Sequence, residues 1–150
     1  MEDRRLLTAP CGLDCFNCEI YEGNLTQEFA RMMSLKAGVP EEAIACRGCR
    51  LQNGAHWHLP TEGCATLRCA RERGVELCCD CEDFPCPLLA PLADGAARFP
   101  HNFKLYNLCR IKKVGLENWV EEAEHIRRAY FHGVFVVGEG QANRSIEDLP

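Results

Sequence analysis

The sequence CGLDCFNC, residues 11–18, places three cysteines within eight residues, with the spacing C-x3-C-x2-C. The whole chain of 150 residues contains 12 cysteines. Such a density is typical either of small secreted domains held by disulfides or of proteins whose loops are held by metal. The bonds that these sulfurs make therefore decide how the chain folds.

The reduced state of the thiols follows from the compartment that we expect. The N-terminal stretch MEDRRLLTAP lacks the apolar segment of a signal peptide, and no apolar run is long enough to cross a membrane. We therefore expect a cytoplasmic protein that does not bind membranes, in a compartment that keeps thiols reduced. There, C-x2-C spacing indicates metal ligands ahead of disulfides or catalytic thiols.

The C-x2-C spacing suits a metal ion because two intervening residues let both sulfurs reach it while backbone N–H groups of the turn face the thiolates. Gly48 gives one of these turns the backbone freedom that it needs. Three such pairs are present: Cys15 with Cys18, Cys46 with Cys49, and Cys78 with Cys81.

Ten of the cysteines are candidate metal ligands. Cys79 is set aside because adjacent side chains rarely converge on one metal, and Cys109 because it is expected to be a buried thiol on the apolar side of a helix. The candidates are Cys11, Cys15, Cys18, Cys46, Cys49, Cys64, Cys69, Cys78, Cys81 and Cys86. Since zinc takes four ligands, they suffice for about two zinc ions.

Proximity along the chain predicts how these ligands pair, because short loops close at lower entropy cost. One site would use Cys69, Cys78, Cys81 and Cys86. The other would use Cys46, Cys49 and Cys64, with a fourth ligand from the group Cys11, Cys15 and Cys18, or from His56 or His58.

An iron–sulfur cluster is the alternative to zinc. The spacing C-x3-C-x2-C is also that of radical S-adenosylmethionine enzymes, where it holds a [4Fe–4S] cluster. Those enzymes build the loop onto a long βα barrel, and this chain has neither the length nor the alternating strands. An iron–sulfur cluster is kept as the alternative to zinc because thiolates are the ligands of both.

Helical patterns flank and interrupt the cysteines. Residues 26–38 predict a helix that Thr26 caps and Gly38 ends, and PEEAIA from Pro40 predicts a further helical turn. Residues 64–74 predict a helix ended by Gly74, and a short helix is expected from Cys86. The buried side of the first helix is expected to comprise Met32, Met33 and Leu35.

Two amphipathic helices are expected after residue 100, with a break at Gly115. The first has Phe103, Tyr106 and Cys109 on its apolar side. The second has an apolar stripe of Leu116, Trp119, Val120, Ala123, Ile126 and Tyr130. Residues 134–137 (VFVV) suggest a short strand.

These patterns predict a mainly α protein with irregular, metal-tied loops. A small cysteine-rich core resembling a zinc knuckle would be joined to the C-terminal amphipathic helices. Residues 1–138 would form one domain, and residues 139–150 a polar tail.

Several of these stretches resemble an uncharacterised cysteine-rich family of bacteria and archaea, domain of unknown function 3795. They are CGLDCFNCEIY from residue 11, CRGCR from 46, CATLRCARERGVELCCDCEDFPC from 64 and NLCRIKKVGLENWVEE from 107. The resemblance covers roughly residues 8–124 and implies metal binding, mostly of zinc, with no assigned reaction and no catalytic residues.

The chain departs from the resemblance at one position. Members often carry a cysteine three residues before the position of Cys64, where this chain has Thr61. If that cysteine normally binds metal, the fourth ligand of the Cys46 site comes from the first cluster or from His56 or His58, or the site is incomplete.

Three kinds of function suit a chain so rich in cysteine. A zinc-stabilised binding or adaptor module, with an unknown protein partner, explains the cysteines without any chemistry. An enzyme or electron carrier would need an open metal site, with Asp14, Asp80, Glu82 or Asp83 as acid–base groups, and no catalytic motif supports it. Nucleic-acid binding is not expected because the net charge is −5.

Overall fold

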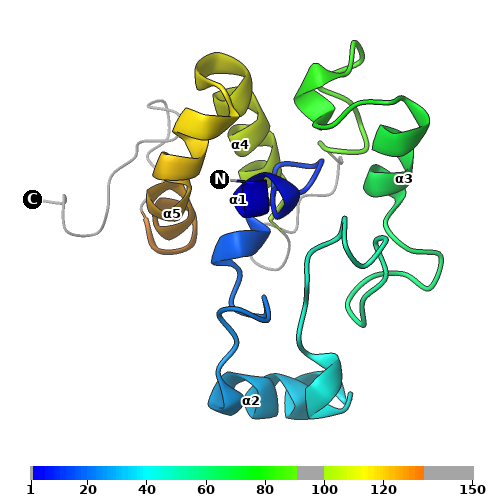
Figure 1. Ribbon diagram of the computed structural model, residues 1–150, viewed down its shortest axis with the longest axis vertical. Helices are drawn as coiled ribbons and strands as arrows, with labels where there is room; N and C mark the ends of the chain where they lie inside the picture. Colours follow the sequence, from blue (N-terminus) through cyan, green and yellow to red (C-terminus); the bar gives the residue numbers. More distant parts are fainter. Residues whose placement is uncertain (1, 91–99, 134–150) are drawn as a thin grey trace, which may run out of the picture.

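The computed structural model describes residues 2–90 and 100–133, and within them the protein is mainly helical (Figure 1). No strand forms in these ranges, where two isolated bridges join Thr8 to Asp14 and Tyr21 to Cys46. The α-helices are α1 (Glu2–Leu6), α2 (Gln27–Ala37), α3 (Ala65–Glu72), α4 (His101–Val114) and α5 (Leu116–His132), and the 3-10 turns are η1 (Cys15–Asn17), η2 (Glu41–Ala43) and η3 (Cys78–Asp80). The predicted mainly α class is confirmed.

Helices α4 and α5 pack side by side as a hairpin that turns at Gly115. Gly115 has a φ of 85°, a value that glycine adopts readily, so the predicted break is confirmed. The predicted stripe of α5 is also confirmed. Trp119, Val120, Ala123 and Ile126 are buried, and Leu116 and Tyr130 pack against the same core.

The predicted buried side of α4 is wrong at Cys109, which is exposed. Phe103 is buried as expected, and Asn107, Leu108 and Ile111 complete the buried face. An α-helix turns about 100° per residue, so positions six residues apart lie about 120° apart around its axis. From Phe103 through Tyr106 to Cys109, the side chains therefore lie progressively farther around the helix from the core, and Cys109 faces outward.

The hydrophobic core lies where loops from the cysteine-rich half pack on this hairpin. Ala9 and Cys11 come from the N-terminal segment, and Leu77, Cys79 and Leu89 from the segment after α3. All five are less than a tenth exposed. The irregular cysteine-bearing loops thus share one core with the two long helices.

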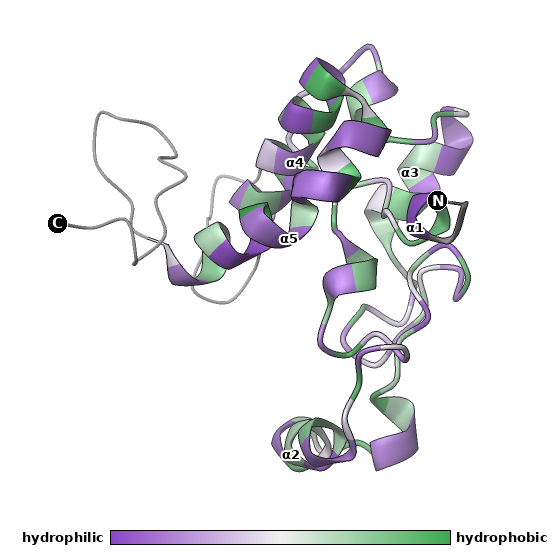
Figure 2. Cartoon of the chain, turned by 60° about the vertical axis from the view of Figure 1, so that its left-hand side comes forward, coloured by the Kyte–Doolittle hydropathy of each residue, from purple (hydrophilic) through white to green (hydrophobic). Residues whose placement is uncertain are grey.

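Helix α2 forms as predicted, but its predicted buried side is wrong at Met32 and Leu35, whereas Met33 is partly buried. Thr26 accepts a hydrogen bond from the N–H of Phe29, and Gly38 ends the helix in the left-handed conformation. Met32 and Leu35, however, are 38% and 80% exposed. Helix α2 packs mainly on η2 and lies at the far end of the molecule from α4 and α5, so no described segment covers that side (Figures 1 and 2).

Helix α3 ends as expected. Gly74 has a φ of 65°, and its N–H and that of Val75 bond back to the carbonyls of Arg71 and Ala70. After Pro40, residues 41–43 form the expected helical turn as η2.

The helix expected from Cys86 is wrong in its described part, where residues 87–89 form a single turn. Cys86 precedes Pro87, and the proline ring disfavours helical backbone at the residue before it. The predicted strand at 134–137 and the polar tail at 139–150 lie outside the described residues.

At Gly12 the first cysteine loop, residues 11–18, comes close to the hairpin. Its φ is 86°, and a Cβ at this position would lie 2.7 Å from the carbonyl oxygen of Lys104 and 2.9 Å from Cγ of Leu108. Asn107 Nδ2 donates to the Gly12 carbonyl at 2.7 Å, and Trp119 Nε1 donates to Asn107 Oδ1 at 3.3 Å. Only glycine fits this contact.

We therefore predict that Gly12→Ala lowers the free energy of unfolding by about 2–5 kcal/mol. A left-handed alanine costs about 1–2 kcal/mol and overpacking about 1–3 kcal/mol more. Gly38→Ala is the matched control, because its φ of 69° is similar and no described atom lies within 4 Å of the place that a Cβ would take there. Denaturant unfolding would contradict the prediction if both variants lost the same stability.

Candidate metal centre

The C-x2-C pairs adopt the tight turns that metal sites use. Cys15 and Cys78 each begin a 3-10 turn, and Cys18 and Cys81 each follow one directly. In the third pair, the N–H of Gly48 donates to Sγ of Cys46 at 3.4 Å, and Gly48 has a φ of 88°. A backbone N–H therefore faces a sulfur there, and Gly48 provides the backbone conformation expected for it.

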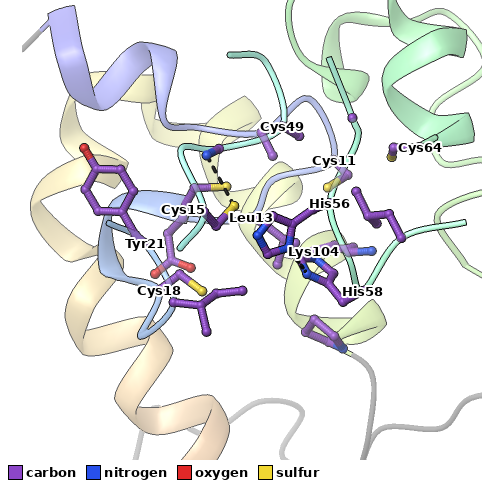
Figure 3. A pocket seen from close by; sticks show the side chains of 18 of the residues that line it. Cys11, Leu13, Cys15, Cys18, Tyr21, Cys49, His56, His58, Cys64 and Lys104 are labelled. Carbon is purple, nitrogen blue, oxygen red and sulfur yellow. Dashed lines mark hydrogen bonds between the residues drawn. The ribbon is translucent and has the colours of Figure 1, made fainter. Parts of the chain in front are cut away.

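Six of the ten candidate cysteines line one cavity of about 200 Å³, which we call the larger cavity because it is the larger of the two that the candidate cysteines line. It lies between the first cysteine loop, the segment 46–64 and helices α4 and α5. Figure 3 shows the labelled cysteines around it, with His56 and His58 beside each other. The cysteines are Cys11, Cys15, Cys18, Cys46, Cys49 and Cys64.

The other four candidates line a second cavity of about 80 Å³, the smaller cavity, beside α3. They are Cys69, Cys78, Cys81 and Cys86. Arg73 also lines it, donating to Sγ of Cys81 at 3.5 Å and pairing with Asp83 at 2.5 Å. The ten cysteines thus divide in space into the two groups that chain proximity predicts, and their role as ligands stays a prediction.

Lining a cavity is not the same as coordinating an ion. Across residues 2–90 and 100–133, no three His, Cys, Asp or Glu side chains converge in an arrangement that could hold a metal. All 12 cysteines lie within these ranges and are free thiols, with no disulfide between them. The sulfurs surround the cavities without converging on one point. The cysteine side chains would have to rotate inward for their sulfurs to share an ion.

The thiols of the larger cavity raise one another's pKa. Burial raises the pKa of Cys15 well above its usual value, and the neighbouring Cys49 and Cys11 raise it further. Burial likewise raises the pKa of Cys49 to about 12, with contributions from Cys11 and Cys64. These groups keep their protons at neutral pH unless a cation compensates the thiolate charge.

One thiol of the smaller cavity, Cys78, has the same electrostatic character. Burial raises the pKa of Cys78 to about 12, and Cys11, Cys86 and Cys69 raise it further. Cys11 lines the larger cavity, so the two groups of thiols are close enough to affect each other.

His56 and His58 could supply nitrogen ligands. The Nδ1 atoms of the two rings lie 2.6 Å apart, and Nε2 of His56 lies 3.2 Å from the carbonyl oxygen of Ala45. A carbonyl only accepts, so Nε2 of His56 donates to Ala45, and Nδ1 of His56 can then accept from Nδ1–H of His58, which leaves the free lone pair on Nε2 of His58. Desolvation, His56 and Lys104 lower the pKa of His58 to about 4, which leaves it neutral at pH 7.

Two cationic side chains at the larger cavity were not found by sequence reasoning. Lys104 of α4 and Arg127 of α5 both line it. Burial raises the pKa of Cys18 while Arg127 opposes this, and burial raises the pKa of Cys11 while Lys104 opposes it. No local spacing signals either residue, because both lie far along the chain from the cysteines that line this cavity.

The other residues considered in the sequence analysis are Cys79 and four acidic side chains. Cys79 is 3% exposed within the hydrophobic core, away from the lining of both cavities. Of the acidic residues considered for catalysis, Asp80, Glu82 and Asp83 are exposed, whereas Asp14 is buried and paired with Arg127.

None of the described helices has the length and apolar character required to cross a membrane.

The chain belongs to the family described as "Protein of unknown function (DUF3795)", whose model matches residues 7–91, more than half of its length. The suspected family is confirmed. The match includes all ten candidate ligands and ends before α4, so the stretch from residue 107 lies outside it. No curated protein and no solved structure matches the chain.

The positions of Cys79 and Cys109 predict their reactivity. In native protein treated with iodoacetamide at pH 8, we expect Cys109 to be modified well before Cys79. Cys109 is exposed, whereas Cys79 is buried and burial raises its pKa to about 11, which leaves about one-thousandth of it as thiolate. Peptide mass spectrometry gives the order, with denatured protein as the control, and equal native rates would contradict it.

Proposed function

We propose that this protein is a cytoplasmic zinc-binding member of its family that acts as a metal-stabilised binding or adaptor module, without catalysis. Each cavity would hold one zinc ion in a small, zinc-knuckle-like core. The observation that carries this proposal is the division of ten cysteines between two cavities, six in one and four in the other.

The smaller cavity supports four-thiolate coordination because it contains the number of sulfurs that tetrahedral zinc takes. Arg73, which donates to Cys81, offsets part of the negative charge that four thiolates bring. In the larger cavity, Cys46, Cys49 and Cys64 would be joined by one ligand from the first loop or by His56 or His58.

The energetics support a structural role for the metal. A structural zinc site can contribute on the order of 10–16 kcal/mol, and a whole domain is typically stable by about 5–15 kcal/mol. Between η2 and α3 the chain forms no helix or strand over residues 44–64, and few apolar side chains there are buried. Loss of one ion would be enough to unfold this part of the protein.

The adaptor role has a candidate surface on α2. Leu35 and Met32 expose an apolar side of this helix at the end of the molecule farthest from the hairpin. Such an exposed apolar surface suits binding to an unidentified protein partner. We do not expect nucleic acid to bind, because the net charge is −5.

An iron–sulfur protein, acting in electron transfer or as an enzyme, is the second candidate. It is favoured by one observation: all three cysteines of the C-x3-C-x2-C loop line the larger cavity, which has more sulfur than one zinc requires.

Anaerobic purification, elemental analysis and an absorption spectrum test both candidates. We expect about two zinc per chain and no visible colour. Brown protein with iron and acid-labile sulfide would instead establish the iron–sulfur candidate.

We also expect Cys81→Ser to lose metal and become insoluble. Cys109→Ser is the matched control, because Cys109 is exposed and should leave both ions in place. A soluble Cys81→Ser protein that retains all its metal would remove Cys81 from the ligand set.

A further inference from the structure

The first cysteine loop is joined to α5 by a buried ion pair. Arg127 Nη1 lies 2.8 Å from Oδ1 of Asp14, whose side chain is fully buried, and Arg127 itself is only 14% exposed. The other carboxylate oxygen of Asp14 accepts from Nδ2 of Asn17 at 3.1 Å. Both oxygens of Asp14 are therefore occupied, one from the helix and one from the loop.

Arg127 also holds the far end of the same loop. Its Nη2 lies 2.6 Å from Oε2 of Glu19, so one guanidinium bridges two carboxylates on either side of η1. Cys15 directly follows Asp14, and Cys18 directly precedes Glu19. The planar fork of an arginine presents donors to both carboxylates in a fixed geometry, whereas an ammonium is a compact charge with freely rotating donors.

We propose that Arg127 is a positioning residue for the larger cavity, setting the places of Cys15 and Cys18 through Asp14 and Glu19. This inference rests on the proposed function, since it assigns an outer-shell role at the same metal site. It also gives α5, which lies outside the family match, a part in metal binding.

A second buried contact from the hairpin also holds the first cysteine loop in place. Asn107, which is fully buried, holds the carbonyl of Gly12 at the start of the loop. Arg127 and Asn107 thus fix the loop from α5 and α4 at points close to Cys15 along the chain. Groups of this kind orient metal ligands and commonly change affinity by about 10- to 100-fold when removed.

The test uses full-length protein loaded with zinc, and with cobalt as a spectroscopic probe of thiolate coordination. Zinc release to a chromogenic chelator is followed. The release phase that changes in Cys18→Ser is assigned to the larger cavity, and the other phase to the smaller one. We expect Arg127→Met to weaken zinc binding in the larger cavity by about 10- to 100-fold. The smaller cavity should be unchanged, and the cobalt–thiolate absorption of the larger cavity should shift.

Two further variants separate positioning from stability. Arg127→Lys keeps the charge without the fork, so it should fold and show a smaller loss confined to the larger cavity. Arg110→Met is the matched control, because Arg110 bridges α4 and α5 through Glu122 at 2.7 Å without lining either cavity. It should leave both zinc affinities and the cobalt spectrum unchanged.

The outcomes distinguish this inference from the proposed function. Wild-type protein that binds no zinc overturns both. Wild-type protein with two zinc ions and unchanged affinity in Arg127→Met overturns the positioning role alone. An equal loss at both cavities would also overturn it, because that result reports general unfolding. Should Arg127→Met fail to fold, the same comparison is made with Arg127→Lys.

Discussion

The packing of residues 8–14 between the α4–α5 hairpin and the segment after α3 is the constraint on which the structure depends. On one side, Asn107 and Arg127 hold Gly12 and Asp14. On the other, the N–H of Cys78 donates to the carbonyl of Pro10 at 2.8 Å. Arg50 completes the junction by donating to the carbonyls of Thr8 and Glu76 at 2.9 and 2.7 Å. Backbone groups that a sheet would satisfy are satisfied here by side chains from distant segments.

This junction brings the two groups of cysteines together. Cys11 belongs to the larger cavity, and the backbone bond between Pro10 and Cys78 brings it beside the smaller one. Burial raises the pKa of Cys78, and Cys11 raises it further across this junction. A cation near Cys11 or Cys78 would favour the thiolate form of that sulfur.

Sequence reasoning succeeded where the determining groups are local and failed where they are distant. Thr26, Gly38 and Gly115 act on the residues next to them, so the limits of α2 and the break between α4 and α5 could be read directly. The grouping of cysteines followed from short loops. Leu35 was misplaced because periodicity identifies an apolar side but not whether anything covers it. Arg127 was missed because its partner Asp14 lies 113 residues away.

The raised thiol pKa values explain how cysteines can gather around a cavity without converging in it. Neutral thiols are small, weakly polar groups that gain little by meeting at one point, whereas thiolates repel one another unless a cation lies between them. A metal that binds there would have to displace protons from groups such as Cys49 and Cys78, whose pKa burial raises to about 12. Ionisation and inward rotation of the sulfurs should therefore occur together, and the affinity for metal should rise with pH. The cations Lys104, Arg127 and Arg73 at the cavity walls reduce the cost of that ionisation before any ion arrives.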